Sequence, residues 1–442
     1  MGSQSSLDHH DVTHVGLRRS NNQDAKGVVV PWNREQYRRR GWLFIVADGM
    51  GAHAAGEMAS ALAVQEVTGA YEKLAARSPP LALRTSIEDA NAKIFARGET
   101  SPDLKGMGTT CTALVIVPRG ALVGHVGDSR AYRVRGGTIE QLSRDHSLVW
   151  DLEEQAGGRD SVVPAGVPKN IITRSMGPHA KVKVDVEGPF PVEPDDVYVL
   201  CSDGLSGQVA DEEIGLLAAA LPPKAAAEAL VGLALARGAP DNVTVIVAKA
   251  GPREKSRVSA TDLPWPLEED DAGSARPGLP WRMLVIAAAS LLLGLMINPW
   301  SRLVASGDET GIVCDLLGKD LGQAVAMAVG VVMLLAFVGS LLAAVLGFLV
   351  PAGGGGRVLR SDQRIGGGPY RTYDCRPTDD LVEGIAASVE AAADGLDGKQ
   401  RQTCVAPLAA ARSAAATGDF TASVTAVAAA LAGFRRAVDS RG

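Results

Sequence analysis

The sequence is poor in aromatic residues and in cysteine. Only 4% of the 442 residues are aromatic, and the cysteines show no paired spacing: Cys111, Cys201, Cys314, Cys375 and Cys404. Small secreted domains are stapled by closely spaced cysteine pairs, and structural zinc sites use short Cys or His spacings. The sequence therefore excludes a disulfide framework and a zinc site, and it favours a reducing compartment.

The chain also lacks an excess of positive charge. It has 44 Lys and Arg residues against 50 Asp and Glu residues, which gives a formal net charge of −6. Domains that bind nucleic acid non-specifically rely on a basic surface. A general nucleic-acid binder is therefore excluded. The first residues have no apolar run, so they do not resemble a secretory signal.

Residues 7–250 mix short strand-like and helix-like segments. Segments rich in β-branched residues and bounded by Gly or Asp predict strands over 42–48, 109–117, 121–135, 196–203 and 242–250. Apolar residues at helical spacing predict helices over 56–77, 81–98 and 224–238. Two helices are adjacent in sequence and several strands run as hairpins. We therefore expect an α+β fold rather than the regular alternation of a parallel sheet.

Two long uncharged runs follow this first domain. Residues 251–280 are rich in Pro, Gly and charge and are expected to form a linker. The runs 283–300 and 321–350 predict two transmembrane helices within residues 281–350, joined by a short external loop. A buried hairpin in a soluble core would also produce such runs, but the tryptophans that flank the first run are typical of a membrane interface.

Arginines lie beside the outer ends of both runs. Arg276 and Arg282 precede the first run and Arg357 and Arg360 follow the second, whereas the loop between them has more acidic than basic residues. By the positive-inside rule, the first domain and the C-terminus would face the cytoplasm from the cell inner (cytoplasmic) membrane. The last segment, 351–442, joins a Gly-rich stretch to an Ala-rich tail. This tail predicts a small helical hairpin or bundle, either a binding surface or a plain packed appendix.

A predicted buried strand ends on a carboxylate at Asp48. Asp-Gly is a common tight turn, so Asp48 followed by Gly49 indicates by itself only a turn. Four more aspartates lie beside predicted strands in the same way: Asp24, Asp128, Asp203 and Asp241. Sheet packing could gather all of them at one rim.

Gathered carboxylates raise one another's pKa unless cations neutralise them. Mg²⁺ and Mn²⁺ are hard divalent ions that prefer oxygen ligands, and the absence of clustered His and Cys argues against zinc. Gly49 has no side chain, so its backbone carbonyl could approach a metal closely. The residues themselves therefore predict a metal site for Mg²⁺ or Mn²⁺.

Ordered pieces of the sequence resemble the bacterial type 2C (PPM family) metal-dependent Ser/Thr protein phosphatases. Over roughly residues 11–248 they are "GLRRSNNQD", "VADGMGAHAAGEMAS", "GMGTTCTAL", "GHVGDSRAYR", "LSRDHSLV", "ITRSMG", "LCSDGLSG" and "PDNVTVIV". The resemblance implies a central antiparallel β-sandwich flanked by helices. It also implies hydrolysis of phosphoserine and phosphothreonine in proteins by a metal-activated hydroxide.

The resemblance also implies metal roles for these aspartates. Asp48 would bridge two metal ions and the Gly49 carbonyl would bind one of them, whereas Asp203 and Asp241 would complete the other. Asp24 would hold metal-bound waters. Asp128, together with Asp203, matches a third-metal position of bacterial members. The implied cofactors are thus two or three Mn²⁺ or Mg²⁺ ions.

Arg19 would bind the substrate phosphate, because its planar guanidinium matches two phosphate oxygens. The alternative is a surface arginine beside Arg18, but the spacing to Asp24 agrees with the motif. The implied catalytic set is Arg19, Asp24 and Asp48. The proton for the leaving alkoxide would come from a metal-bound water or from His53, which could equally be a structural residue of the turn.

Some positions depart from the family pattern. Gln23 stands where an acidic residue is usual and Ala52 where Gly is usual, although no direct metal ligand is lost. Residues 147–171 are expected to form a flap beside the site.

The sequence thus predicts a membrane-tethered protein phosphatase for the segment 7–250. Its substrates would be phosphorylated proteins, including a cognate Ser/Thr kinase. The alternative is a catalytically weak phosphoprotein-binding or scaffold module on the same fold, which Gln23 favours. A channel is disfavoured, since the two runs contain no charge that would mark a pathway.

Overall fold

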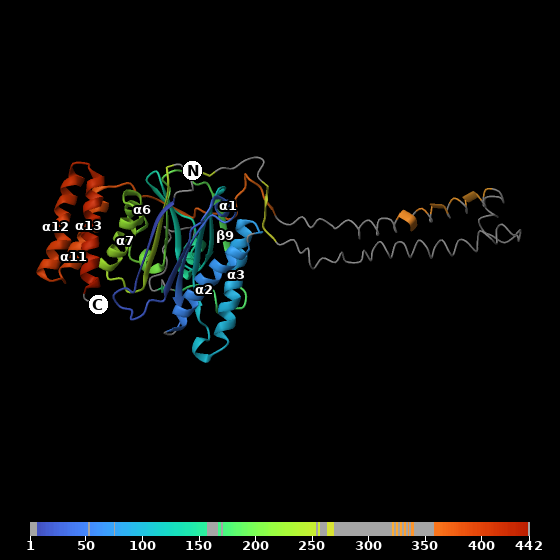
Figure 1. Cartoon of the computed structure of the whole chain (residues 1–442), viewed down its shortest axis with the longest axis horizontal. Coiled ribbons are helices and arrows are strands. Elements are labelled where there is room, and N and C mark those ends of the chain that lie inside the picture. Colours follow the sequence, from blue (N-terminus) through green and yellow to red (C-terminus); the bar gives the residue numbers. More distant parts are fainter. Residues whose placement is uncertain are drawn as a thin grey trace. The chain divides into compact units, whose positions relative to one another are not determined.

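The structure is a computed structural model that describes residues 7–51, 54–74, 76–156, 167–168, 171–252, 255–256, 263–268 and 358–440, with scattered residues between 321 and 339. The chain divides into two compact units, Met1–Leu267 with Val358–Gly442, and Glu268–Arg357. The first unit thus contains chain from both sides of the second. All elements described below belong to the first unit (Figure 1).

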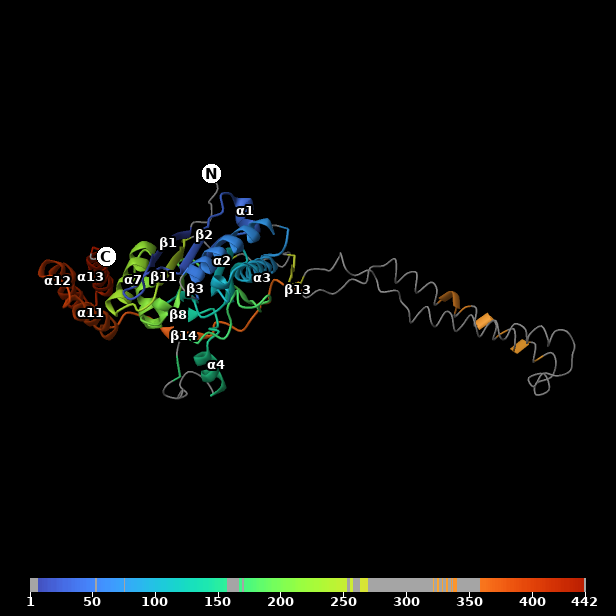
Figure 2. The same cartoon turned by 90° about the horizontal axis from the view of Figure 1, so that it is seen from below.

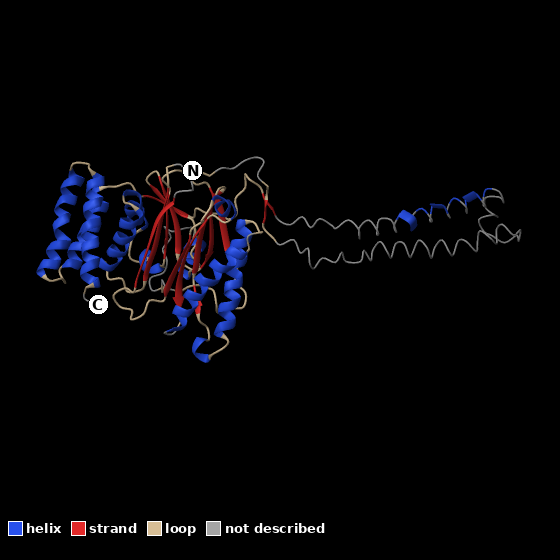
Figure 3. Ribbon diagram, in the orientation of Figure 1, coloured by secondary structure: helices blue, strands red, loops and turns tan. Residues whose placement is uncertain are grey.

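Two antiparallel sheets form the centre of this unit (Figure 3). The first sheet has the order β1 (Leu7–His14), β11 (Val243–Ala250), β10 (Val197–Cys201), β7 (Arg130–Arg135), β8 (Thr138–Gln141) and β14 (Arg371–Asp374). The second sheet has the order β2 (Asp24–Val29), β3 (Trp42–Met50), β5 (Cys111–Val117), β6 (Gly120–Val126) and β9 (Asp185–Phe190), and the short β4 (Gly108–Thr109) pairs with β3. The architecture is therefore an antiparallel β-sandwich.

Strand β3 faces a separate core on each side. Leu43 and Ile45 pack with the helices that cover the second sheet, whereas Phe44 and Val46 pack between the two sheets. Successive strand residues point to opposite faces of a sheet. A strand covered on both faces must therefore be apolar without interruption, which explains the unbroken run that precedes Asp48.

Helices cover the outer faces of the sandwich. Helices α2 (Ala54–Lys73) and α3 (Pro79–Gly98) contact the second sheet, and α6 (Asp211–Ala220) and α7 (Pro223–Ala236) contact the first. Figure 2 shows α7 and the pair α2 and α3 on opposite sides of the strands. The short helices are α1 (Arg34–Arg39), α4 (Leu148–Gln155), α5 (Asp203–Ser206) and a 3₁₀ turn, Pro102–Leu104.

The C-terminal tail forms a bundle of three helices that packs on α7. The helices are α11 (Asp379–Ala393), α12 (Gly398–Ala416) and α13 (Phe420–Asp439), capped at their N-termini by Thr378, Asp397 and Asp419. Helix α13 approaches α7 so closely that a Cβ on Gly232 would lie 2.8 Å from the Leu431 carbonyl oxygen. One apolar core runs from the first sheet through α6 and α7 into the bundle.

The chain on either side of the second unit is paired within the first unit. Strand β12 (Trp265–Pro266) pairs antiparallel with β13 (Val358–Leu359). Residues that follow β13 run on to β14, which adds an edge strand to the first sheet beside β8. The first part of the predicted linker, 251–280, therefore belongs to the first unit, which extends to Leu267.

The structure confirms the α+β class and the antiparallel sandwich. The predicted strand over 121–135 is two strands, β6 and β7, which turn at residues 127–129. The predicted span 283–300 lies outside the described residues, as does most of the span 321–350. In the part of the chain that the structure describes, no helix is both long and apolar enough to cross a bilayer.

Candidate functional site

The five aspartates singled out from the sequence lie at strand ends of both sheets. Asp24 begins β2 and Asp48 lies near the end of β3, both in the second sheet, and Asp128 lies in the turn between β6 and β7. Asp203 follows β10 and Asp241 precedes β11, both in the first sheet. The sandwich therefore brings carboxylates from distant parts of the chain to one edge.

Asp24 and Asp48 are direct partners in the antiparallel register of β2 and β3. Side chains in opposite positions of an antiparallel pair share one face of the sheet, about 5 Å apart at Cβ, and like charges there repel. Gly49 follows Asp48 in β3 and packs against the first turn of helix α2. A Cβ on Gly49 would lie 2.2 Å from the Gly56 carbonyl oxygen and 2.6 Å from that of Gln23. Only glycine fits this approach of the two backbones.

Hydrogen bonds connect the two sheets at this edge. The Ser202 hydroxyl donates to Asp24 Oδ2 at 2.8 Å and accepts from the Thr244 backbone N–H at 3.0 Å. The carboxyl group of Asp203 lies close enough to that of Asp48 to raise its pKa.

Several carboxylate oxygens at this edge are buried and unpartnered. In the part of the chain that the structure describes, Asp24 Oδ1, Asp128 Oδ1 and Asp203 Oδ1 have no hydrogen-bond partner. Buried polar atoms are rarely left in this state, because an unsatisfied group costs about 1–3 kcal/mol. The oxygens therefore indicate a site that is completed by a ligand.

The pKa values of four of the clustered aspartates are raised because these carboxyl groups are buried close to one another. Burial raises the pKa of Asp24 to about 7, and burial together with Asp203 and Asp145 raises that of Asp128 to about 8. Burial, followed by Asp24, Asp203 and Asp128, raises the pKa of Asp48 well above its usual range. Burial also raises the pKa of Asp203. A divalent cation would reverse this effect by favouring the ionised carboxylates.

The donor set fits Mg²⁺ or Mn²⁺, since it consists of carboxylate oxygens and a backbone carbonyl. The described residues contain no group of three His, Cys, Asp or Glu side chains already arranged as a metal cage. Mg²⁺ commonly keeps several waters and binds through one or two carboxylates, so it does not require such a cage. The predicted ligands thus lie at one edge, and their role as ligands stays a prediction.

Arg19 lies at the same edge and is half exposed. Its Nη2 donates to Asp241 Oδ2 at 2.7 Å, with side-chain exposures of 50% and 35%. Asn242 holds the loop that carries Arg19, because its amide donates to the Val15 and Asn21 carbonyls and its Oδ1 accepts from the Gln23 N–H. The predicted phosphate-binding arginine is therefore positioned beside the carboxylates.

A cavity of about 350 Å³ lies next to Asp128 and Asp203. One wall is helix α4, with Val149, Trp150 and Glu153, and a further lining residue is Arg371 from the edge strand β14. The cavity also contains two paired groups, Arg130 and Asp145, which are 2.7 Å apart. It provides room beside the carboxylates for part of a substrate.

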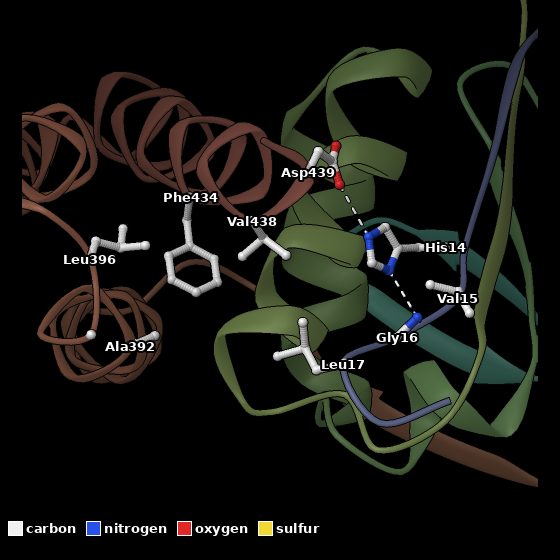
Figure 4. Close-up of a pocket in the computed structure, with 10 residues that line it drawn as sticks. His14, Val15, Gly16, Leu17, Ala392, Leu396, Phe434, Val438 and Asp439 are labelled. Atoms are coloured by element: carbon white, nitrogen blue, oxygen red, sulfur yellow. Dashed lines mark hydrogen bonds and ion pairs between the residues drawn. The ribbon is translucent and has the colours of Figure 1, made fainter. Parts of the chain in front are cut away.

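A second cavity, of about 540 Å³, separates the tail bundle from the loop that leads to Arg19 (Figure 4). His14 Nδ1 accepts from the Gly16 N–H at 2.9 Å, and its Nε2 faces Asp439 Oδ1 at 3.1 Å. Figure 4 shows Phe434 and Val438 of α13 lining the bundle side of this cavity. The tail thus contacts the chain a few residues before Arg19.

Two histidines near the site have structural roles. His125 is fully buried and contacts the Thr112 hydroxyl, and His146 accepts from the Gly127 N–H through Nδ1. Burial lowers the pKa of His125 to about 3 and also lowers that of His146. Both rings are therefore neutral supports of the turn that carries Asp128.

Some residues that shape the site were not predicted from the sequence. Ser202, Thr244 and Asn242 lie beside predicted ligands in sequence, so hydroxyl and amide neighbours of those aspartates could have identified them. Nothing in the local sequence pointed to Arg371, which lies far from the motifs. His53, Ala52 and residues 157–166 and 169–170 of the predicted flap lie outside the described residues.

Comparisons with known proteins agree with this geometry. A protein-family model described as protein phosphatase 2C matches residues 17–227. The serine/threonine phosphatase stp of Listeria welshimeri is 33% identical over 250 residues, which are 55% of this chain and 96% of that protein. The serine/threonine protein phosphatase PstP of Mycobacterium tuberculosis is 36% identical over 227 residues, which are 50% of this chain and 43% of that protein.

A crystal structure of the PstP catalytic domain with two manganese ions is similar at 34% identity and a TM-score of 0.46, and it covers 55% of this chain and 98% of that one. The identity to stp spans nearly the whole of that relative. The chain therefore belongs to the protein phosphatase 2C family and is a serine/threonine protein phosphatase.

Proposed function

We propose that the chain hydrolyses phosphoserine and phosphothreonine in proteins with the aid of two or three Mn²⁺ or Mg²⁺ ions, at the cytoplasmic face of a membrane. The observation that supports this most strongly is the group of buried, unpartnered carboxylate oxygens of Asp24, Asp128 and Asp203. The use of Mn²⁺ or Mg²⁺ by phosphatases of this family agrees with that oxygen-rich donor set.

Each residue has a role in this proposal. Asp48, the Gly49 carbonyl, Asp203 and Asp241 would hold two cations, and Asp24 would orient water that belongs to their coordination. Asp128 would hold a third cation together with Asp203. When bound, the cations would supply Lewis acidity and lower the pKa of a water, so that hydroxide is available as the nucleophile near neutral pH.

Arg19 would bind and orient the phosphate group. Its guanidinium lies at the rim and is half exposed, so two of its N–H groups can face two phosphate oxygens. Its partner Asp241 holds it at that rim from the first sheet. Substrate proteins would thus be positioned with the phosphate between Arg19 and the carboxylate cluster.

The direct test is release of phosphate from a phosphothreonine peptide by the full chain with Mn²⁺. We expect turnover that depends on the metal, stops on addition of a chelator, and falls at least about 100-fold in Asp203→Asn, more than the loss typical of an outer-shell partner. Absence of turnover at any concentration of Mn²⁺ or Mg²⁺ would contradict the proposal.

A binding or scaffold role without turnover is the second candidate, and Gln23 is the observation that favours it. The Gln23 carbonyl accepts two hydrogen bonds, from the Gly49 N–H at 3.1 Å and from the Ser60 hydroxyl at 2.5 Å. The Gln23 side chain, however, is an amide at a position where the family usually has an acidic side chain. Equal affinity for a phosphopeptide in the wild type and in Asp203→Asn, with no turnover in either, would favour this role.

The membrane attachment rests on the apolar runs 283–300 and 321–350 and on their arginine-rich outer flanks. Pairing of β12 with β13 brings the chain on both sides of the inserted unit together, which a hairpin of two spans requires. Attachment would raise the local concentration of phosphatase near membrane substrates such as a cognate Ser/Thr kinase.

Cys314 offers a test of this topology. It lies between the two runs, and the other four cysteines are buried in the first unit. We expect a membrane-impermeant thiol reagent to label Cys314 when applied from outside the cytoplasmic membrane, with Cys314→Ser as the unlabelled control. Labelling only after that membrane is broken would place the loop on the cytoplasmic side.

A further inference from the structure

The chain that returns from the second unit is attached along the whole sandwich. Strand β13 pairs with β12, and Ile365 and Gly188 exchange two backbone hydrogen bonds, of 2.6 and 3.0 Å. The Tyr370 N–H then donates to the Gln141 carbonyl at 2.8 Å, where β14 starts to pair with β8. We call residues 358–376 the return strand segment.

The return strand segment satisfies a buried carboxylate of the sandwich. Glu187 of β9 is only 4% exposed, and it accepts from the Gly368 N–H at 3.2 Å and from the Tyr370 hydroxyl at 2.5 Å. Gly366 has φ +80°, and a Cβ there would lie 1.7 Å from Glu187 Oε2, so this position favours glycine. The contacts are specific, since burying Glu187 without such partners would be costly.

Arg371 of this segment is bound to the flap helix α4. Its guanidinium pairs with Glu153 and lies 3.5 Å above the ring of Trp150, and the Tyr370 ring meets the edge of the same tryptophan. Side-chain exposures of 15% for Arg371 and 16% for Glu153 show that the pair is largely shielded from water. Such pairs are stronger than surface ion pairs when both partners are held in place.

The same three side chains line the cavity beside the carboxylate cluster. Trp150, Glu153 and Arg371 line this space of about 350 Å³ together with Asp128 and Asp203. A phosphorylated residue held at the carboxylates would direct its neighbours in the peptide toward this space. The shape of the cavity therefore depends on the position of helix α4.

We propose that Arg371 is a positioning residue for protein substrates: it fixes helix α4 from the return strand segment and so shapes the cavity that receives peptide residues flanking the phosphorylated one. The inference rests on the proposed function, because it assigns substrate contacts to the same site. In this proposal, a residue of the return strand segment affects substrate binding, although Arg371 itself does not touch the reacting phosphate.

The nature of the contact requires arginine. Its planar group can pair with Glu153 and stack on Trp150 at the same time, whereas the lysine ammonium is a point charge that stacks poorly. A methionine at this position would keep much of the apolar stem over the ring but would lose the ion pair. Arg376 is a matched control, because it lies just after β14, is 73% exposed and pairs only with Asp374 among the described residues.

The test compares two substrates on the full chain with Mn²⁺: p-nitrophenyl phosphate, which has no peptide, and a phosphothreonine peptide with residues on both sides. We expect Arg371→Ala to raise KM for the peptide about tenfold with KM for p-nitrophenyl phosphate within about twofold. Arg371→Lys should recover part of the peptide affinity, and Arg376→Ala should behave as wild type. Arg371→Met replaces Arg371→Ala if the latter does not fold.

Two results would overturn the inference. Equal KM values for the peptide in wild type and in a folded Arg371→Ala or Arg371→Met would show that the pairing does not affect substrate binding. An equal rise in KM for both substrates would show a general structural role instead. If the wild type hydrolyses neither substrate, the proposed function fails, and this inference fails with it.

Discussion

Single residues at the edge of the sandwich are arranged against their own electrostatic preference. Asp24 and Asp48 are placed opposite each other by the register of β2 and β3, and the nearby carboxylate of Asp203 also raises the pKa of Asp48. Opposed carboxylates raise each other's pKa and destabilise a fold unless a cation binds between them. A fold retains such a cluster when the cluster has a function.

Replacing one of these carboxylates should separate activity from stability. In Asp48→Asn, we expect phosphate release from a phosphothreonine peptide with Mn²⁺ to fall at least about 100-fold, because the proposed function makes Asp48 a ligand shared by two cations. The melting temperature of the protein in a chelator should stay equal or rise, since one repelling acid is removed. Asp89→Asn, on the exposed face of α3, is the control and should change neither quantity.

The histidines near the turn at Asp128 make stability depend on pH. The pKa of His125 is lowered to about 3 in the fold by burial, against about 6.5 in an unfolded chain. Below about pH 6.5 the unfolded chain therefore binds a proton that the folded chain does not, so the stability due to neutral His125 is present above that pH and is lost as pH falls toward 3.

This effect can be isolated with His125→Gln. Between pH 7 and pH 5, the wild type should lose about 2 kcal/mol more free energy of unfolding than the variant, because the other groups titrate in both. Urea unfolding at the two pH values, with a chelator present, measures this difference. Parallel losses in both proteins would show that His125 is protonated in the fold.

At the scale of elements, the site depends on how closely β3 and helix α2 approach. Gly49 and Gly56 let the two backbones meet, and the Gln23 carbonyl lies at the same contact. This packing brings the end of β3 and the start of α2 together beside Asp48. The approach of these two elements is therefore a requirement of the site.

Adding a methyl group at that contact should disrupt it. We expect Gly49→Ala to lower the free energy of unfolding by roughly 2–4 kcal/mol, since the new Cβ would overlap two carbonyl oxygens. Gly69→Ala is the matched control inside α2, where nothing lies within 4 Å of the new Cβ. It should stabilise the protein by about 0.5–1 kcal/mol, because alanine favours the helix. Equal stabilities of the two variants in urea would refute the close contact.

Some strands of the sandwich could be predicted from the sequence and others could not. Strands β3, β5, β10 and β11 are apolar runs, so their presence and approximate positions are visible without a structure. The carboxylates could be predicted to converge because each adjoins such a strand. Strand β14 could not, since it is short, only half-buried, and pairs with β8 from more than 200 residues away. Long-range pairing of this kind has no local signal, and Arg371 was missed for that reason.

At the scale of the whole molecule, the tail is part of the phosphatase domain's core. The apolar core that begins at the first sheet continues through α7 to Val427 and Leu431 of α13. From the sequence, the Ala-rich tail was open to interpretation as a binding module or a packed appendix. Its helical spacing predicted the helices, but the small alanine and glycine residues did not reveal the surface on which they pack.

A shared core predicts that the sandwich and the tail unfold together. We expect Leu431→Ala to lower the free energy of unfolding by about 2–5 kcal/mol and to shift a single transition that is seen equally in helix content and in phosphatase activity. Lys399→Ala, on the exposed first turn of α12, should leave that transition unchanged. If helix content is lost in Leu431→Ala before activity falls, the tail unfolds independently.

The metal site is tested most directly by anomalous diffraction from crystals of the protein grown with Mn²⁺. We expect at least two peaks about 4 Å apart, with carboxylate oxygens of Asp48 and Asp203 within about 2.0–2.3 Å of manganese. Peaks confined to other surfaces, or an edge of the sandwich without manganese, would contradict the claim that these aspartates form the metal site of the phosphatase.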